Sequence, residues 1–100
     1  MNTLADPTST LHETFAEFEA AANQRGCSAV LERRWAADAA VPEHAHDFAV
    51  TALVVQGRMW LTVGPATREL APGDRFELDA GVAHAERYGS EGATFWVARR

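Results

Sequence analysis

Three of the four histidines in this 100-residue chain are spaced as the ligands of one small metal site would be. His44 and His46 form a His-x-His pair, and His84 follows beyond a run of strand-like segments. Neutral imidazole is the commonest protein metal ligand, and alternate residues of a strand point to one face of a sheet. A later strand carrying His84 would complete three fixed ligands, with positions left open for water or substrate. The alternative, histidines that only line a barrel rim, suits a lone histidine better than this set.

Two further side chains are candidates for proton transfer next to the histidines. Glu86 has the same strand parity as His84, so it can face the same lumen as a fourth ligand or as a group that orients a ligand. Tyr88 follows in the same phase, and we take Glu86 and Tyr88 as candidate catalytic residues. A solvated carboxylate is the alternative, which we prefer for Asp47 and, less strongly, for Glu86. No Ser-His-Asp or Cys-His arrangement and no glycine-rich phosphate loop stands out.

β-strands must position these residues. Apolar side chains at every second position after Ser28 predict such strands. Seven short strands with turn residues between them predict an all-β fold, a sandwich or a small barrel. The predicted strands are residues 30–35, 48–55, 59–63, 68–70, 75–78, 84–88 and 93–98. We expect residues 36–43 to be a connection, Gln56-Gly57 to close a hairpin, and residues 89–92 to form a turn between the last two strands.

Side-chain parity predicts which residues line the lumen beside the histidines. If His44 and His46 point inward, alternate residues of the following strand share their face, and residues 76 and 78 show the same alternation. The expected pocket residues are Phe48, Val50, Ala52, Phe76 and Leu78. The opposite parity leaves Leu53, Val55 and Trp60 facing outward, where the N-terminal helix or a second subunit can cover them. We prefer a homodimer to a monomer, since a domain of this size gains stability from association.

One helix is predicted before the strands, and the whole chain forms one domain. Residues 10–26 have an apolar stripe at helical spacing, a capping box at Thr10 and Glu13, and Gly26 as a left-handed C-terminal cap. Residues 1–9 are expected to be a frayed N-terminus and residues 27–100 to form the barrel. Cys27 is the only cysteine, so no intrachain disulfide can form, and we expect it to be a packed small residue.

Composition and charge argue against several classes of partner. The net charge of −5 argues against a nucleic-acid surface, because phosphate binding requires clustered cations. No apolar run approaches the ~20 residues that a membrane-spanning helix needs. The N-terminus lacks the basic and apolar regions of a signal peptide. We therefore expect a cytoplasmic protein with a small-molecule partner and with no nucleic-acid or membrane partner.

The spacing of these residues resembles the two motifs of the cupin superfamily. The first motif runs Gly, five residues, His-x-His, three or four residues, Glu, six residues, Gly, and His44, His46 and Gly57 fall on it. The second runs Gly, five residues, Pro-x-Gly, two residues, His, three residues, Asn, and Gly73, Gly81 and His84 match it. The resemblance spans residues 35–88. It implies a small double-stranded β-helix, a jelly-roll-like barrel, and a dimer formed through its sheets.

The chain also departs from these motifs. Asp38, Asp79 and Tyr88 stand where the first Gly, the Pro and the Asn are usual. Val50 occupies the position of the metal-binding Glu, so the chain is similar to three-His cupins, a type known among dioxygenases. Loss of the carboxylate makes the complex more cationic, opens a coordination position and leaves an apolar wall.

The resemblance leaves two classes of function open. One is an enzyme that holds a divalent transition metal (iron, manganese, nickel, copper or zinc) through His44, His46 and His84. Such an enzyme would act on a small apolar substrate, for example as an oxygenase or a related enzyme. The other is a non-enzymatic small-molecule-binding or sensor module, with or without metal, as in the effector-binding parts of sugar-responsive transcription regulators. The fold does not choose between them, because function depends on the site.

Overall fold

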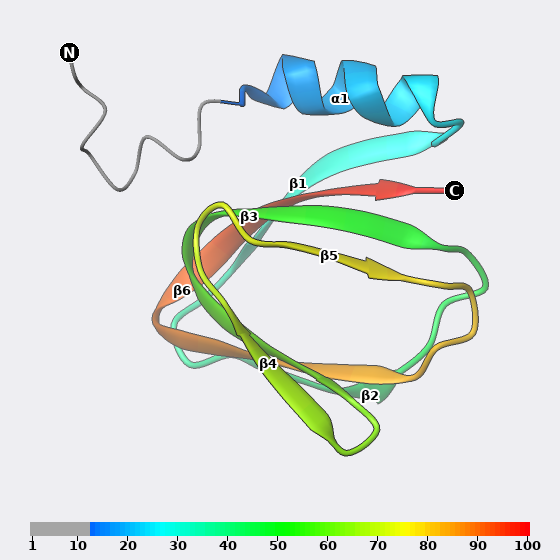
Figure 1. Cartoon of the computed structure of the whole chain (residues 1–100). Coiled ribbons are helices and arrows are strands. Elements are labelled where there is room, and N and C mark those ends of the chain that lie inside the picture. The colour runs from blue at the N-terminus through cyan, green and yellow to red at the C-terminus, as the bar shows by residue number, and fades with distance from the viewer. Residues whose placement is uncertain (1–12) are drawn as a thin grey trace, which may run out of the picture.

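Within the part of the chain that the structure describes, the alternating pattern produces six antiparallel strands preceded by one helix (Figure 1). A computed structural model describes residues 13–100. Its elements are α1 Phe15–Gln24, β1 Ala29–Trp35, β2 Ala40–His44, β3 Val50–Val63, β4 Ala66–Leu70, β5 Arg75–Leu78 and β6 His84–Arg99. The strands join in the order β1-β6-β3-β4, while β2 pairs with β6 and β5 pairs with β3. The prediction of a small all-β barrel with one helix is confirmed.

Two long, bent strands organise the barrel. β3 has 14 residues and β6 has 16, well beyond the roughly five or six residues of an ordinary strand. The first half of β6 pairs with β2 and with the end of β3, whereas its second half pairs with β1 and with the start of β3. One pair of strands therefore belongs to both halves of the barrel, and the bend between the halves encloses the lumen.

The bend occurs at glycines, where we had expected turns. Gln56-Gly57 does not close a hairpin and residues 89–92 do not form a turn, because β3 and β6 continue through these positions. Two register shifts instead bracket Gln56 and Gly57, and Gly57 pairs with Ala93. Gly57 and Gly92 both have positive φ, at 78° and 70°, so the two glycines bend a continuous ladder.

The connection expected at residues 36–43 contains a strand. β2 begins at Ala40 and pairs with the first half of β6, while the bend before it is made at Asp38. Asp38 has φ 59°, a left-handed conformation that glycine favours, and its N–H donates to the carbonyl of Gly89 at 2.9 Å. Asp38 stands where the cupin motif has glycine, so the local conformation is kept without the usual residue.

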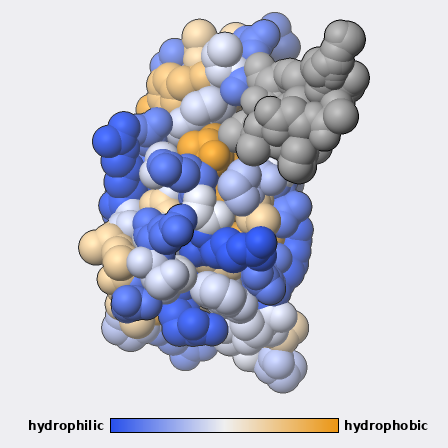
Figure 2. All heavy atoms as spheres, turned by 90° about the vertical axis from the view of Figure 1, so that its left-hand side faces the viewer, coloured by the Kyte–Doolittle hydropathy of each residue, from blue (hydrophilic) through white to orange (hydrophobic). Residues whose placement is uncertain are grey.

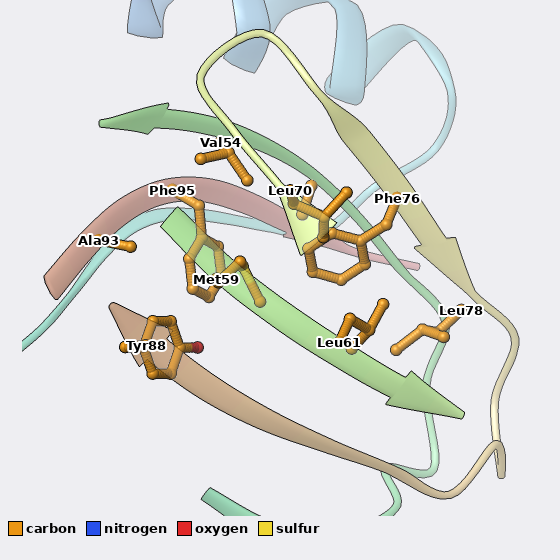
Figure 3. Packing of buried hydrophobic residues seen from close by; sticks show 10 residues of the cluster. Val54, Met59, Leu61, Leu70, Phe76, Leu78, Tyr88, Ala93 and Phe95 are labelled. Atoms are coloured by element: carbon orange, nitrogen blue, oxygen red, sulfur yellow. The ribbon is translucent and has the colours of Figure 1, made fainter. Parts of the chain in front are cut away.

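The lumen side of the barrel is a continuous apolar core (Figure 3). Val54, Met59, Leu70 and Tyr88 are at most 1% exposed, and they come from β3, β4 and β6. Alternate residues of β3 thus face inward as predicted, with the parity re-set after Gly57. Tyr88 lies at the inner end of this core, where its ring stacks on Trp35 at a centroid distance of 5.2 Å.

Helix α1 covers the outer face of the same strands (Figure 1). Phe18 and Ala22 pack with Leu53 of β3 and Trp96 of β6, and Cys27 is buried in the same cluster. The helix is therefore what covers Leu53, one of the two alternatives predicted for the outward-facing residues. Trp60 is covered differently, because its cross-strand neighbour Arg87 places its guanidinium 4.3 Å from the Trp60 ring.

The helix begins later than the sequence pattern predicted. Thr14 caps it, and Thr14 and Glu17 form a reciprocal capping box one turn beyond the expected pair. Thr10 lies outside the described residues, as do residues 1–9. Gly26 follows the last turn with φ 85°, as expected for a left-handed cap.

The face of the molecule in Figure 2 is mostly hydrophilic, with hydrophobic atoms in small separate groups. This face therefore presents no continuous apolar surface to a second subunit, and the homodimer stays a prediction. Among residues 13–100, no helix combines the length and apolar character needed to cross a membrane.

Candidate metal centre

The end of β2 and the start of β6 bring two of the predicted ligands side by side. His44 is the last residue of β2 and pairs directly with His84, the first residue of β6. Their ring centroids lie 4.3 Å apart. His84 is 3% exposed, whereas His44 is about one-third exposed at the cavity side of the sheet. Residues 40 positions apart therefore meet because the two strands are in register.

His46 reaches the same point from the loop after β2. Its backbone carbonyl accepts a 2.7 Å hydrogen bond from the N–H of Gly81, which ties the His46 loop to the turn before β6. Its ring stacks on the Phe48 ring with an interplanar angle of 15°. The guanidinium of Arg99 lies over the same Phe48 ring, 4.4 Å from its centroid. His46 is thus held by a backbone contact and by aromatic packing rather than by a strand.

The three imidazoles form one cluster of possible metal ligands. One ring nitrogen from each of His44, His46 and His84 lies within 4.8 Å of the others. Nδ1 of His44 lies 2.9 Å from the carbonyl of Pro42, and Nδ1 of His84 lies 3.0 Å from the carbonyl of Val82. A carbonyl only accepts, so both Nδ1 atoms carry the proton and both Nε2 atoms are free to bind a metal.

Burial favours the neutral, metal-binding form of His46. Burial lowers the pKa of His46 below its usual value, and the neighbouring His44 and His84 lower it further. Glu86 opposes this shift, and Arg99 adds to it. A neutral imidazole has the lone pair that a metal requires, so this donor is ready near neutral pH.

Glu86 lies against this cluster, not in solvent. Its side chain is 11% exposed, and Oε2 lies 3.5 Å from Nε2 of His84 and 4.0 Å from Nε2 of His44. Our preference for a solvated Glu86 is therefore wrong, whereas Asp47 is exposed as expected. A carboxylate therefore lies beside the histidines although Val50 has none, because β6 carries Glu86 on the same face as His84.

Tyr88 holds the carboxylate of Glu86. Its hydroxyl donates a hydrogen bond to Oε1 of Glu86, which leaves Oε2 directed at the imidazoles. Burial and this hydrogen bond raise the pKa of Tyr88 well above its ordinary value. The phenol is thus a proton-bearing donor at neutral pH, and Glu86 and Tyr88 form a hydrogen-bonded pair beside the three histidines.

A cavity of about 390 Å³ opens beside the cluster, within the range of small-molecule sites. Phe48, Val50, Phe76 and Leu78 line it, as expected from parity. Ala52 does not line the cavity, because it is fully buried in the core below.

Sequence reasoning missed one wall of this cavity. β1 and the second half of β6 contribute Leu31, Arg33, Trp35, Phe95, Val97 and Arg99. No alternating pattern pointed to it, since Phe95, Trp96 and Val97 are all apolar and Arg33 lies between Glu32 and Arg34. What the sequence lacked was the pairing of β1 with β6, which places both runs on the lumen face.

Comparison with known proteins identifies the family of this chain. The family described as AraC-like ligand binding domain matches residues 26–98, nearly three-quarters of the chain. The chain belongs to this family. The matched segment of this AraC-like domain contains β1 to β5, all of β6 except its last residue, Arg99, and all three clustered histidines. A search of curated proteins finds no match.

Solved structures similar to this AraC-like domain are cupins. KdgF from Halomonas sp. is 19% identical with a TM-score of 0.62, and the alignment covers 70% of this chain and 67% of KdgF. An RmlC-like cupin from Shewanella frigidimarina is 21% identical with a TM-score of 0.63 over 70% of this chain and 63% of that one.

Oxalate decarboxylase from Bacillus subtilis, a protein with Mn(II) centres, is 23% identical with a TM-score of 0.65 over 70% of this chain. The alignment covers only 20% of that enzyme, so this chain spans a small part of its length. These similarities establish the cupin fold. Cupins of this shape include metal-dependent enzymes and ligand-binding domains, and the three histidines here are positioned to hold a metal.

Proposed function

We propose that this chain is a three-His cupin that holds a divalent transition metal through His44, His46 and His84 and uses it on a small molecule in the adjacent cavity. The observation that carries the proposal is the meeting of three histidines beside a cavity, with two Nδ1 atoms turned away toward carbonyls. Rim histidines without a ligand role have no need of this common orientation.

The donor set fits a borderline metal. Imidazole suits zinc, copper, iron and nickel, and one nearby carboxylate extends the range toward manganese. Three protein ligands leave coordination positions open, so a bound metal would polarise a substrate group or activate dioxygen. Glu86 Oε2 is close enough to two of the imidazoles to serve as a fourth donor or to orient them.

The other residues of the cavity bind the small molecule and manage protons. Phe76, Phe95 and Val97 present apolar surface that excludes water from the bound molecule. Oε2 of Glu86 is the atom that would accept a proton from it, while Tyr88 keeps its own proton and holds Oε1. This division assigns the base to Glu86 and the positioning of that base to Tyr88.

A second candidate is a non-enzymatic sensor or ligand-binding module. The family match favours it, since the family is described by ligand binding. The same cavity would then hold a small effector, with the metal as a structural or recognition element.

The experiment that tests the metal site is elemental analysis of protein purified without added metal. We expect close to one equivalent of a transition metal, or its uptake on incubation with iron, manganese, nickel, copper or zinc. Less than about a tenth of an equivalent under both conditions would contradict the proposal. If metal is present, oxygen consumption with dicarbonyls and thiols favours the enzyme, and unchanged oxygen across those compounds favours the sensor.

Tyr88→Phe tests whether the phenol positions Glu86. We expect the metal affinity to fall about tenfold, because partners that orient a ligand group contribute roughly 10- to 100-fold. Calorimetric titration with Zn²⁺ measures the affinity, and circular dichroism checks the fold. Glu43→Gln is the matched control, since Glu43 lines the same cavity but lies outside the histidine cluster. An affinity equal to that of the unchanged protein would show that Tyr88 has no part in the site.

A further inference from the structure

Two arginines stand on the otherwise apolar wall of the cavity. Arg33 of β1 and Arg99 of β6 line it together with the three histidines. Both are exposed, so their guanidinium groups lie at its mouth. Each is placed by an aromatic ring, since Arg33 lies 5.4 Å from the Trp35 centroid and Arg99 lies 4.4 Å from the Phe48 centroid.

These two arginines have no acidic partner within residues 13–100. Four other arginines form ion pairs with glutamates on the surface, at positions 25, 34, 58 and 75. No such pair within 4.0 Å involves Arg33 or Arg99 in the described part of the chain. The carboxylate of Glu86 is held by Tyr88, and Glu43 is exposed. In a chain with a net charge of −5, two guanidiniums at one cavity are thus left with free donors.

The strand register places the two guanidiniums at different points of the mouth. Ala29 pairs with Arg99 and Arg33 pairs with Phe95, so the two arginines are four register positions apart. At about 3.3 Å per residue, their backbones are roughly 13 Å apart along the strands. A molecule that enters between them meets a guanidinium at either end and apolar side chains between.

We propose that the small molecule bound in this cavity is a dicarboxylic acid, with its apolar body against Leu31, Phe95 and Val97, one carboxylate on the guanidinium group of Arg33 and the other on that of Arg99. Arginine matches a carboxylate with two parallel hydrogen bonds, which gives direction as well as charge. The inference rests on the proposed function, because it names the substrate class of the same site. It also corrects the expectation of a purely apolar substrate.

The test compares small carboxylic acids with their neutral amides. Succinate, adipate and suberate are titrated into the protein by calorimetry, each beside the corresponding diamide. We expect at least one acid to bind at least about tenfold more tightly than its amide. Arg33→Gln and Arg99→Gln should each weaken that acid by about tenfold, while Arg34→Gln, on the same strand but paired with Glu32 outside the cavity, should leave it unchanged.

Titration of metal-loaded and chelator-treated protein separates this inference from the metal site. Loss of binding in the arginine variants in both states, with equal metal content, supports the arginines as the carboxylate site. Equal binding of acid and amide, an arginine-independent preference, or no acid binding below about 10 mM would overturn the inference. Acid binding that requires the arginines in a protein that takes up no metal would instead overturn the proposed function alone.

Discussion

Replacing His84 by alanine should abolish stoichiometric metal binding. His84 is the most buried of the three histidines, and its Nδ1 is held by the carbonyl of Val82, so its Nε2 is the most rigidly placed donor. Removal of a ligand should cost more than the roughly 10- to 100-fold that loss of an orienting partner costs, so we expect the affinity to fall more than about 100-fold. Elemental analysis and calorimetric titration with Zn²⁺ measure the change.

Stability gives a second readout of the same variant. A metal that binds only the folded state stabilises it, by about 2.7 kcal/mol at a free concentration 100 times its dissociation constant. The unchanged protein should therefore resist urea better with metal than with chelator, and His84→Ala should show no such difference. Glu43→Gln, at the same cavity, should keep the full metal effect. Retention of one equivalent of metal by His84→Ala would show that the ligand set is wrong.

Replacing Gly57 by alanine should destabilise the barrel by about 2 to 5 kcal/mol. An added Cβ would lie 2.1 Å from the carbonyl oxygen of Gly92 and 2.8 Å from Cα of Ala93, and both of these are backbone atoms. The left-handed conformation at φ 78° costs roughly 1–2 kcal/mol for an L-residue, and overpacking adds roughly 1–3 kcal/mol. The loss is large beside the 5–15 kcal/mol that is usual for the total stability of a domain. Urea unfolding in the presence of chelator measures it.

Gly64→Ala is the matched control for this clash. Gly64 also has positive φ, at 56°, but an added Cβ there meets nothing within 4 Å. We expect it to lose only the roughly 1–2 kcal/mol of the backbone conformation. If the two variants lose equal stability, the close approach of β3 to β6 at Gly57 is not what holds the bend.

The candidate metal ligands were predictable because local spacing and strand parity suffice to group them. His44 and His46 are two residues apart, and the cupin-like spacing brings in His84 without any knowledge of the barrel's shape. The turn at Gly81, also part of that spacing, donates its N–H to the carbonyl of His46. Sequence spacings of this kind predict the same grouping of residues that the folded chain shows.

The position of Glu86 was less predictable from the sequence. Parity placed it on the side of His84, but parity alone does not decide whether a carboxylate is solvated or buried. Its burial depends on the hydrogen bond from Tyr88 and on the pairing of Val41 with Glu86 across β2 and β6. The strand pairing joins residues 45 positions apart, and no local pattern contains it.

Glycine was misread for a related reason. Gln56-Gly57 and Gly92 have the composition of turns, and both glycines do adopt positive φ. Whether such a glycine ends a strand or bends it depends on whether the hydrogen-bonded ladder continues on its far side. Here the ladder between β3 and β6 continues, because Gly57 allows the backbone of β3 to approach that of β6 more closely than a side chain permits. Gly92 allows the same close approach of β6 to the end of β1, at the carbonyl of Trp35.

The sequence by itself determined the all-β barrel, the helix that covers it and the three histidines, since periodicity and spacing are properties of neighbouring residues. Only the tertiary structure decided that the Glu86 carboxylate lies beside these histidines and that Arg33 and Arg99 line the cavity. The physical reason is that both depend on strand register, which is set by pairing between distant segments and by the bend at Gly57 and Gly92.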